Sequence, residues 1–188
     1  MATGPEGARS LQGALINQPS DVALRPGVQA DARSIAEVHV ETWRVAYRGQ
    51  VPADYLESLS VDQRESMWRA MLAETGTQTF VLDHDARVVG FANVSTSRDK
   101  DAAPATGELA AIYVLPERWG HGAGHTLMAS AVDALRDAGN SIAKLWVLET
   151  NSRARAFYEA HGWAADGATK VEERGSFVLR EVRYRTTI

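Results

Sequence analysis

The sequence predicts an α/β (α+β) fold, with a mixed, largely antiparallel central sheet of six to seven strands and helices on both faces. Three observations support this prediction. Apolar residues recur with helical spacing over residues 31–72, two β-rich runs form a hairpin pattern over residues 77–97, and strand and helix patterns alternate from residue 107 onward. This order of elements is typical of a mixed sheet covered on both sides.

The first strand and the first helices are predicted within residues 21–72. The run DVALRPGV predicts a short strand that ends in a turn at Pro26 and Gly27. A helix is predicted from a cap at Asp31 to about Tyr47, with a buried face made of Ile35, Val38, Thr42 and Val45. After a helical turn in residues 51–59, a capping-box pattern at Ser60 and Gln63 starts another helix, whose predicted inward residues are Met67, Trp68, Met71 and Leu72.

The second half of the chain alternates between strands and helices. The hairpin of residues 77–97 turns at His84-Asp85-Ala86, and a further strand is predicted for residues 107–115. The segment 122–138 is an amphipathic helix that Gly139 is placed to end, with an apolar stripe of Leu127, Ala131, Leu135 and Ala138. A buried strand at 142–149, a short helix at 151–161 and a strand at 176–185 complete the pattern.

Length and composition set the domain organisation. The chain has 188 residues, enough for one sizeable core. Residues 1–20 are rich in Gly, Pro, Ser and Gln and show no periodicity, so we expect a disordered extension there. No linker or repeat divides the remainder, and residues 21–188 are predicted to form a single domain.

Charge and cysteine content exclude several classes of protein. The formal net charge is −4 and there is no block of Lys or Arg, so we expect no nucleic-acid binding. The absence of cysteine excludes disulfides, thiolate zinc sites and a cysteine nucleophile. Neither a membrane-spanning apolar run nor a signal-peptide pattern is present. We therefore expect a cytoplasmic protein without a membrane partner, acting as a monomer or homodimer.

A glycine-rich loop between a strand and a helix is the first functional signal. Gly120, Gly122 and Gly124 precede the predicted helix, where free amides and the helix dipole favour an anion. The same glycines could equally serve close packing of the helix on the strand. The P-loop pattern fails because no Lys follows Gly124, whereas a dinucleotide site stays open because Glu149 ends the next strand.

The segment Trp119-Gly120-His121-Gly122-Ala123-Gly124 resembles the coenzyme A loop of the GCN5-related N-acetyltransferase (GNAT) superfamily. That loop follows the pattern Gln/Arg-x-x-Gly-x-Gly/Ala, and here Trp stands at its first position. The run LETNSRARAFYEAHGW, residues 148–163, resembles the second signature of the superfamily. Weaker similarities in HVETWRVAYRG, VVGFANV and LREVRYR extend the match over residues 22–186. The resemblance implies the GNAT fold, with splayed strands at an acetyl-CoA (coenzyme A) site.

The resemblance also assigns roles to particular residues. It implies Glu108 as the general base and Tyr158 as the general acid. Trp43, Tyr47 and Tyr55 would form the acceptor pocket, with Glu41 and Glu57 nearby. The implied cofactor-binding residues are Ile112, Tyr113, Val114, Trp119, Gly120, His121, Gly122, Ala123, Gly124, His125, Thr126, Asn151, Arg153 and Phe157.

The predicted function is acetyl-CoA-dependent transfer of an acetyl group to a primary amine, by direct attack in a ternary complex. The expected acceptor is a small molecule, with a peptide or protein amine as the alternative. A non-catalytic acyl-CoA sensor and a dinucleotide-dependent oxidoreductase are the other classes considered. No metal is expected, because His121 and His125 lack a third ligand in the sequence pattern.

Overall fold

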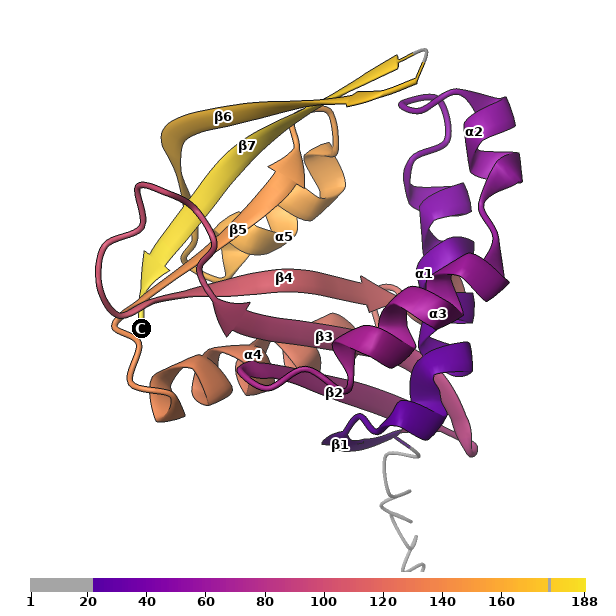
Figure 1. Ribbon diagram of the computed structural model, residues 1–188, viewed down its shortest axis with the longest axis horizontal. Helices are drawn as coiled ribbons and strands as arrows, with labels where there is room; N and C mark the ends of the chain where they lie inside the picture. Colours follow the sequence, from indigo (N-terminus) through magenta and orange to yellow (C-terminus); the bar gives the residue numbers. More distant parts are fainter. Residues whose placement is uncertain (1–21, 176) are drawn as a thin grey trace, which may run out of the picture.

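The computed structural model describes residues 22–175 and 177–188, so the predicted extension 1–20 lies outside the described residues. Seven strands form one sheet in the order β1-β2-β3-β4-β5-β7-β6 (Figure 1), and every neighbouring pair is antiparallel except β4 and β5. The predicted mixed, largely antiparallel sheet is confirmed. The strands are β1 (Val22–Pro26), β2 (Thr77–His84), β3 (Arg87–Thr96), β4 (Thr106–Val114), β5 (Ile142–Leu148), β6 (Ala164–Arg174) and β7 (Phe177–Thr187).

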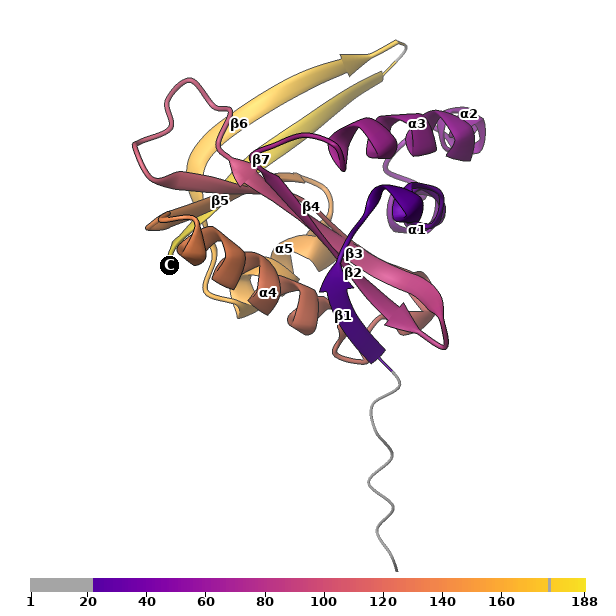
Figure 2. The same cartoon turned by 60° about the horizontal axis from the view of Figure 1, so that its bottom comes forward.

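Helices cover both faces of the sheet, as predicted (Figure 2). The first three helices lie together on one side, and α1 also packs on β3 and β4. On the other side, α4 packs on β2, β3 and β4, and α5 lies behind β5. The helices are α1 (Ala32–Ala46), α2 (Ala53–Ser58), α3 (Val61–Met71), α4 (Ala123–Asp137) and α5 (Ser152–Ala160), with short 3₁₀ turns at η1 (Gln29–Asp31) and η2 (Pro116–Arg118).

Two hydrophobic clusters hold these layers together. The larger joins α1 and α4 to the β2–β4 part of the sheet and contains the fully buried Ile35, Phe91 and Leu127. The smaller joins α1 and α2 to the ends of β5 and β7 through Val40, Val51, Leu56, Leu59, Leu148 and Leu179. The smaller cluster therefore fixes the tip of the β6–β7 hairpin beside α2 (Figure 1).

The strand β6 has no counterpart among the elements predicted residue by residue. Its side chains are almost all exposed, so they lack the alternation of apolar and polar residues that marks a half-buried strand. Its pairing with β7 slips between Ala165 and Thr169. Backbone pairing to β7 at the edge of the sheet, and not burial, makes this segment a strand.

Some predicted helix faces were only partly correct. Val45 and Met67 are 39% and 36% exposed, and Ala138 is exposed just beyond the end of α4, so these three do not belong to the core. They lie at the margins of their apolar stripes, where periodicity alone does not show how far the neighbouring element extends.

Two predicted helix caps differ in outcome. Asp31 precedes α1, but its carboxylate accepts hydrogen bonds from Arg25 and the Val28 amide, and not from an amide of α1. The Ser60 cap is confirmed, because its hydroxyl accepts a hydrogen bond from the amide of Gln63.

The strands β4 and β5 pair over only three rungs and then separate. Residues 106–108 pair with 142–144, whereas β4 continues to Val114 and β5 to Leu148 without further pairing. The register of β3 and β4 shifts at the same place, leaving Ala110 as an extra residue in β4. Such a bulge bends its strand and increases the local twist. The result is a V-shaped gap in the middle of the sheet (Figure 1).

The replacement Gly107→Ala should destabilise the fold, because Gly107 lies where β4 and β5 are about to separate. A Cβ at Gly107 would lie 2.5 Å from a methyl group of Leu135 and 3.1 Å from the side chain of Asn140. Because the core there is closely packed, we expect the free energy of unfolding to fall by about 1–3 kcal/mol. Urea denaturation measures this change, and an unchanged midpoint would contradict the packing described.

Candidate functional site

The gap in the sheet begins at an ion pair between its last two paired residues. Glu108 of β4 and Lys144 of β5 are register partners on the final rung, and the Lys144 Nζ atom lies 3.2 Å from Glu108 Oε2. The side chains of Glu108 and Lys144 are 11% and 3% exposed. The Arg98 amide donates to the same carboxylate oxygen at 3.4 Å, whereas Oε1 has no polar contact among the described residues. The pair ties β4 to β5 where they separate.

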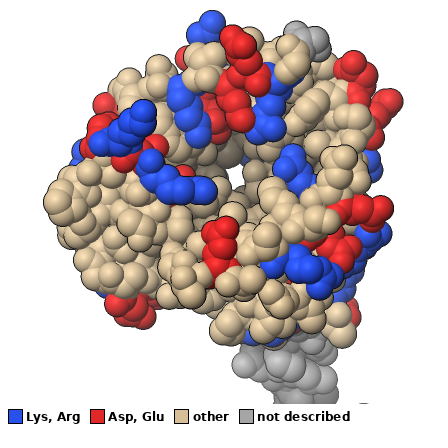
Figure 3. All heavy atoms as spheres, in the orientation of Figure 1, with Lys and Arg blue, Asp and Glu red and all other residues tan. Residues whose placement is uncertain are grey.

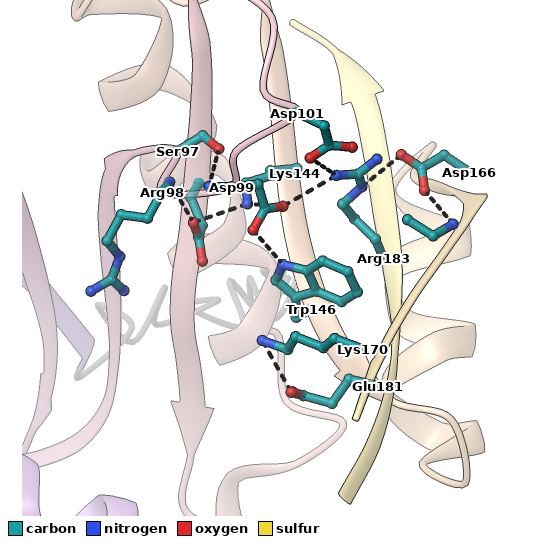
Figure 4. Close-up of polar contacts among 12 residues, drawn as sticks. Ser97, Arg98, Asp99, Asp101, Lys144, Trp146, Asp166, Lys170, Glu181 and Arg183 are labelled. Carbon is teal, nitrogen blue, oxygen red and sulfur yellow. Dashed lines mark hydrogen bonds and ion pairs between the residues drawn. The ribbon is translucent and has the colours of Figure 1, made fainter. Parts of the chain in front are cut away.

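Lys144 also pairs with Asp99, which fastens the β3–β4 connection onto β5 and β7 (Figure 4). The Asp99 carboxylate accepts hydrogen bonds from the Trp146 indole at 3.3 Å and from Arg183 at 3.2 Å. Arg183 in turn binds Asp101 and Asp166, each at 2.8 Å. These long-range contacts were not found from the sequence, because no local pattern links residues so far apart.

Strand alternation shows which side of the sheet this network faces. The Tyr184 hydroxyl donates to Glu159 of α5 at 2.6 Å, so Tyr184 points toward α5. Its neighbour Arg183 therefore points to the opposite side, together with its cross-strand partner Trp146. That side is the one occupied by α1–α3, and it is hollowed at its centre, with charged side chains of both signs around the opening (Figure 3).

Two backbone amides of β4 face the gap. Leu115 donates its amide to Val89 of β3, so alternate residues before it also bond to β3. Ile112 and Val114 occupy the intervening positions and direct their backbone groups away from β3. The Val114 carbonyl accepts hydrogen bonds from the Trp119 indole at 2.7 Å and the Thr42 hydroxyl at 3.3 Å, which fits this orientation. Of the three predicted backbone donors, the amides of Ile112 and Val114 face the gap, whereas the amide of Tyr113 faces β3.

The glycine loop leads directly into α4 and leaves its N-terminal amides free. Gly120 and Gly122 have positive φ angles of 79° and 87°, and a Cβ at either would meet nothing within 4 Å. Gly122 caps α4 without any side-chain hydrogen bond. The amide of Thr126 already bonds to the Gly122 carbonyl at 3.1 Å, so the free donors end at His125. The open space and free amides suit an anion.

Gly124 has a different role from the other two glycines. A Cβ there would lie 3.2 Å from the ring of Phe157, so glycine permits close packing of α4 on α5. Of the two interpretations that the sequence left open, anion binding suits Gly120 and Gly122, and close packing suits Gly124.

Trp119, which stands where the expected loop pattern has Gln or Arg, is covered by the guanidinium of Arg153. Arg153 of α5 stacks on the Trp119 ring, with its central carbon 3.5 Å from the ring centroid. Burial lowers the pKa of Arg153, and no acidic side chain among the described residues pairs with it. Trp119 thus places a cation from another helix beside the glycine loop.

The histidines of this region contact protein groups. His121 Nδ1 lies 2.9 Å from the Trp119 carbonyl oxygen, and His125 Nδ1 lies 2.8 Å from Nε2 of His161. The second nitrogen of His161 contacts the Phe157 carbonyl oxygen at 2.7 Å. His161 was not predicted as a site residue, although it lies four residues after Phe157 and on the same helix face.

Three tyrosines converge on the gap. Tyr158 of α5 is 8% exposed, and its hydroxyl has no hydrogen-bond partner among the described residues. Burial, with a smaller contribution from Tyr113, raises the pKa of Tyr158 well above its usual value. Burial likewise raises the pKa of Tyr47 and of Tyr113, and the charge of Glu181 on β7 adds to both increases. A neutral phenol at Tyr158 is therefore available inside the gap at neutral pH.

An aromatic layer supports these tyrosines from α1. Trp43 donates its indole N–H to the Tyr113 hydroxyl at 3.1 Å and meets the Tyr47 ring edge-on at 4.6 Å. His39 stacks on Tyr113 at 4.9 Å and accepts a hydrogen bond from the Trp68 indole at 3.1 Å. The predicted residues Trp43 and Tyr47 thus lie beside the gap.

The remaining predicted site residues lie farther out or in the helix cap. Tyr55 packs edge-on against Phe177 at 4.7 Å, at the tip of the β6–β7 hairpin. Asn151 caps α5 by accepting a hydrogen bond from the Ala154 amide at 3.1 Å. Glu41 pairs with Arg87 at 3.7 Å, so Glu181, which was not predicted, supplies the carboxylate near the tyrosines.

A model of the acetyltransferase (GNAT) family matches residues 36–163. An uncharacterized N-acetyltransferase, YuaI of Bacillus subtilis, is 36% identical over 141 residues, covering 74% of this chain and 79% of that protein.

None of the helices in the described part of the chain is both long and apolar enough to span a membrane.

Two solved structures share the fold. The PaiA N-acetyltransferase of Thermoplasma acidophilum in complex with coenzyme A aligns with a TM-score of 0.67 and 21% identity, over 89% of this chain and 99% of that one. YncA of Salmonella typhimurium, described as a putative acetyltransferase with its cofactor acetyl-CoA, aligns with a TM-score of 0.65 and 19% identity, over 89% and 94% of the two chains.

The buried His39 should make stability depend on pH. Burial, aided by the charge of Arg64, lowers the pKa of His39 to about 3, whereas an unfolded histidine titrates near ~6.5. Between these values the unfolded chain binds the extra proton, so stability is lost as the pH falls below 6.5. From pH 6.5 to 5, the free energy of unfolding should fall by about 1–2 kcal/mol more in the parent than in His39→Gln, which keeps an acceptor for Trp68. If urea titrations show the same loss of the free energy of unfolding in the parent and in His39→Gln over this pH range, the assignment to His39 is wrong.

Proposed function

Because the chain belongs to the acetyltransferase (GNAT) family and is an acetyl-CoA-dependent N-acetyltransferase, we propose that it acetylates the primary amine of a small molecule. The amine attacks the thioester directly while both substrates are bound. The observation that carries this proposal is the gap between β4 and β5, where free amides and a neutral phenol meet beside the glycine loop.

The glycine loop and Arg153 are proposed to hold the diphosphate of acetyl-CoA, which supplies an activated acetyl group when bound. The amides from His121 to His125 donate to the phosphate oxygens, with support from the α4 dipole. Arg153, held on Trp119, adds the positive charge. Because main-chain donors do most of this work, Trp can replace the Gln or Arg of the usual pattern at position 119.

The amides of Ile112 and Val114 are proposed to stabilise the negative charge that develops on the thioester carbonyl oxygen. They lie in the gap without a strand partner, so no protein hydrogen bond has to break. Tyr158 then donates its proton to the leaving sulfur. Because burial raises its pKa, the phenol is protonated at neutral pH and holds the proton that the sulfur takes up as the carbon–sulfur bond breaks.

Glu108 remains the proposed base, but its neighbours leave one of its two carboxylate oxygens available. Lys144 and the Arg98 amide occupy Oε2, so only Oε1 is free to accept a proton from the amine, directly or through a water. Glu108 therefore combines this chemical role with the ion pair that ties β4 to β5.

The proposed preference for a small acceptor rests on the enclosure of the acceptor side. Leu148 and Leu179 pack against Leu56 and Leu59, so the β6–β7 hairpin meets α2 above the gap. We infer that this contact restricts the approach to the gap from the side occupied by α1–α3. A folded protein would have to displace the hairpin, whereas a small amine would not.

Kinetics of single variants test the proposed catalytic pair. Tyr158→Phe should lower kcat with acetyl-CoA and an acetylated amine by about 10²–10³-fold, because the leaving sulfur loses its proton donor. Glu108→Gln should lower kcat by about 10²-fold at neutral pH, and less at high pH where the amine is already neutral. The readout is release of free thiol, with coenzyme A binding measured in parallel as a control. Parent-like rates in both variants would contradict the mechanism.

Arg153→Gln should weaken binding of the cofactor without changing the chemical step. Loss of one charge-assisted contact to phosphate should raise the KM for acetyl-CoA about tenfold and leave kcat unchanged. Arg136→Gln is the matched control, because Arg136 lies at the far end of α4 and pairs with Asp133. Equal KM values for the two variants would exclude Arg153 from the diphosphate site.

A further inference from the structure

A half-buried arginine that has no acidic partner in the described part of the chain lies beside the aromatic layer. Arg64 belongs to α3 and stands one turn before the buried Trp68. Its guanidinium lies 3.6 Å from the sulfur of Met67 and 5.8 Å from the centre of the Trp43 ring. Within residues 22–175 and 177–188, no ion pair joins Arg64 to a carboxylate. The positive charge of Arg64 is therefore not neutralised by this part of the chain.

The acidic residues of α3 bind other arginines. Asp62 and Glu65 both pair with Arg33 of α1, the second at 3.2 Å. Glu65 also binds Arg69 at 2.7 Å. Arg33 and Arg69 are about half exposed, at 50% and 56% of their side-chain area, so these pairs lie on the outer surface of the helices. Negative charge is thus available on α3, but it is held away from Arg64.

Arg64 is close to the proposed acceptor side of the gap. The Trp43 indole that lies under its guanidinium donates a hydrogen bond to the Tyr113 hydroxyl. One aromatic side chain therefore separates Arg64 from the tyrosines in the gap. The charge of Arg64 also acts on this layer, because it adds to the effect of burial in lowering the pKa of His39.

A carboxylate stands on the other wall of the same space. Glu181 of β7 faces the side occupied by α1–α3 and is 19% exposed at its side chain. It pairs with Lys170 at 3.1 Å, and its charge raises the pKa of Tyr47 and Tyr113 in addition to burial. Among the described residues, the acceptor side thus has a cation without an acidic partner on α3 and a carboxylate, paired with Lys170, on β7.

We propose that the acceptor carries a carboxylate as well as its amine, and that Arg64 binds this carboxylate. The inference rests on the proposed acetylation of a small amine and narrows it to compounds of the amino-acid class. A guanidinium presents two parallel N–H donors that match the two oxygens of a carboxylate. A cation partly withdrawn from water gains most from an anionic ligand. Glu181, on the facing wall, favours the ammonium end.

Paired acceptors test this assignment. Initial rates are measured with acetyl-CoA and a panel of amino acids, each compared with its own carboxamide, which keeps the amine but lacks the carboxylate. The parent should show a kcat/KM at least about tenfold higher for the acid, and Arg64→Gln should reduce this ratio to about one with an unchanged KM for acetyl-CoA. The control Arg69→Gln, on the outer surface of α3, should keep the parent ratio.

A binding measurement separates failure of this inference from failure of the proposed function. Thermal shifts are recorded for the coenzyme A-saturated protein with N-acetyl amino acids and with their carboxamides. A thermal shift that requires the carboxylate in the parent and disappears in Arg64→Gln supports the contact between Arg64 and the carboxylate. If such a shift is seen but no amine in the panel is acetylated, the proposed acetylation of a small amine fails and the binding inference stands. Equal shifts for acids and amides, or an acid preference that survives Arg64→Gln, would overturn it.

Discussion

The separation of β4 from β5 after one buried ion pair is the constraint on which the rest of the structure depends. Glu108 and Lys144 hold the last rung, and the bulge at Ala110 turns β4 away immediately afterwards. Beyond that point the amides of Ile112 and Val114 have no strand partner among the described residues. Buried backbone donors that a fold leaves unpaired must be satisfied by water or by a ligand. The gap that the interrupted sheet leaves is therefore the feature on which the proposed acetyl-CoA site depends.

The two sides of the sheet contribute different kinds of chemical group to the gap. On the α4–α5 side, the recognition that we propose depends on main-chain amides and a helix dipole, which do not vary with the identity of the side chains. This explains how Trp119 can replace a polar residue, while Arg153 arrives from another helix. On the α1–α3 side, the proposed recognition depends on side chains. Trp43 and Tyr47 belong to α1 and its C-terminal cap and Glu181 belongs to β7, and these two elements meet only in the folded chain.

Much of the fold followed from local patterns in the sequence. Six of the seven strands and all the main helices were predicted, because each has its own periodicity, turn residues or cap. The exception, β6, is exposed along almost its entire length and lacks such a pattern. The misassigned core residues Val45, Met67 and Ala138 lie at the margins of helix faces, where burial depends on how far the neighbouring element reaches.

The sequence by itself determined the glycine loop, the caps at Ser60 and Asn151, and the presence of Tyr158 on the short helix after β5. These features depend on residues within one turn of each other, whose backbone preferences are fixed locally. Only the tertiary structure decided where β4 and β5 separate and that Asp99 holds the β3–β4 connection. It also decided that Arg33 and Arg69 pair with carboxylates, whereas Arg64 has no such partner among the residues that the structure describes. Such contacts join residues far apart in the chain, and which partners meet depends on the packing of whole elements.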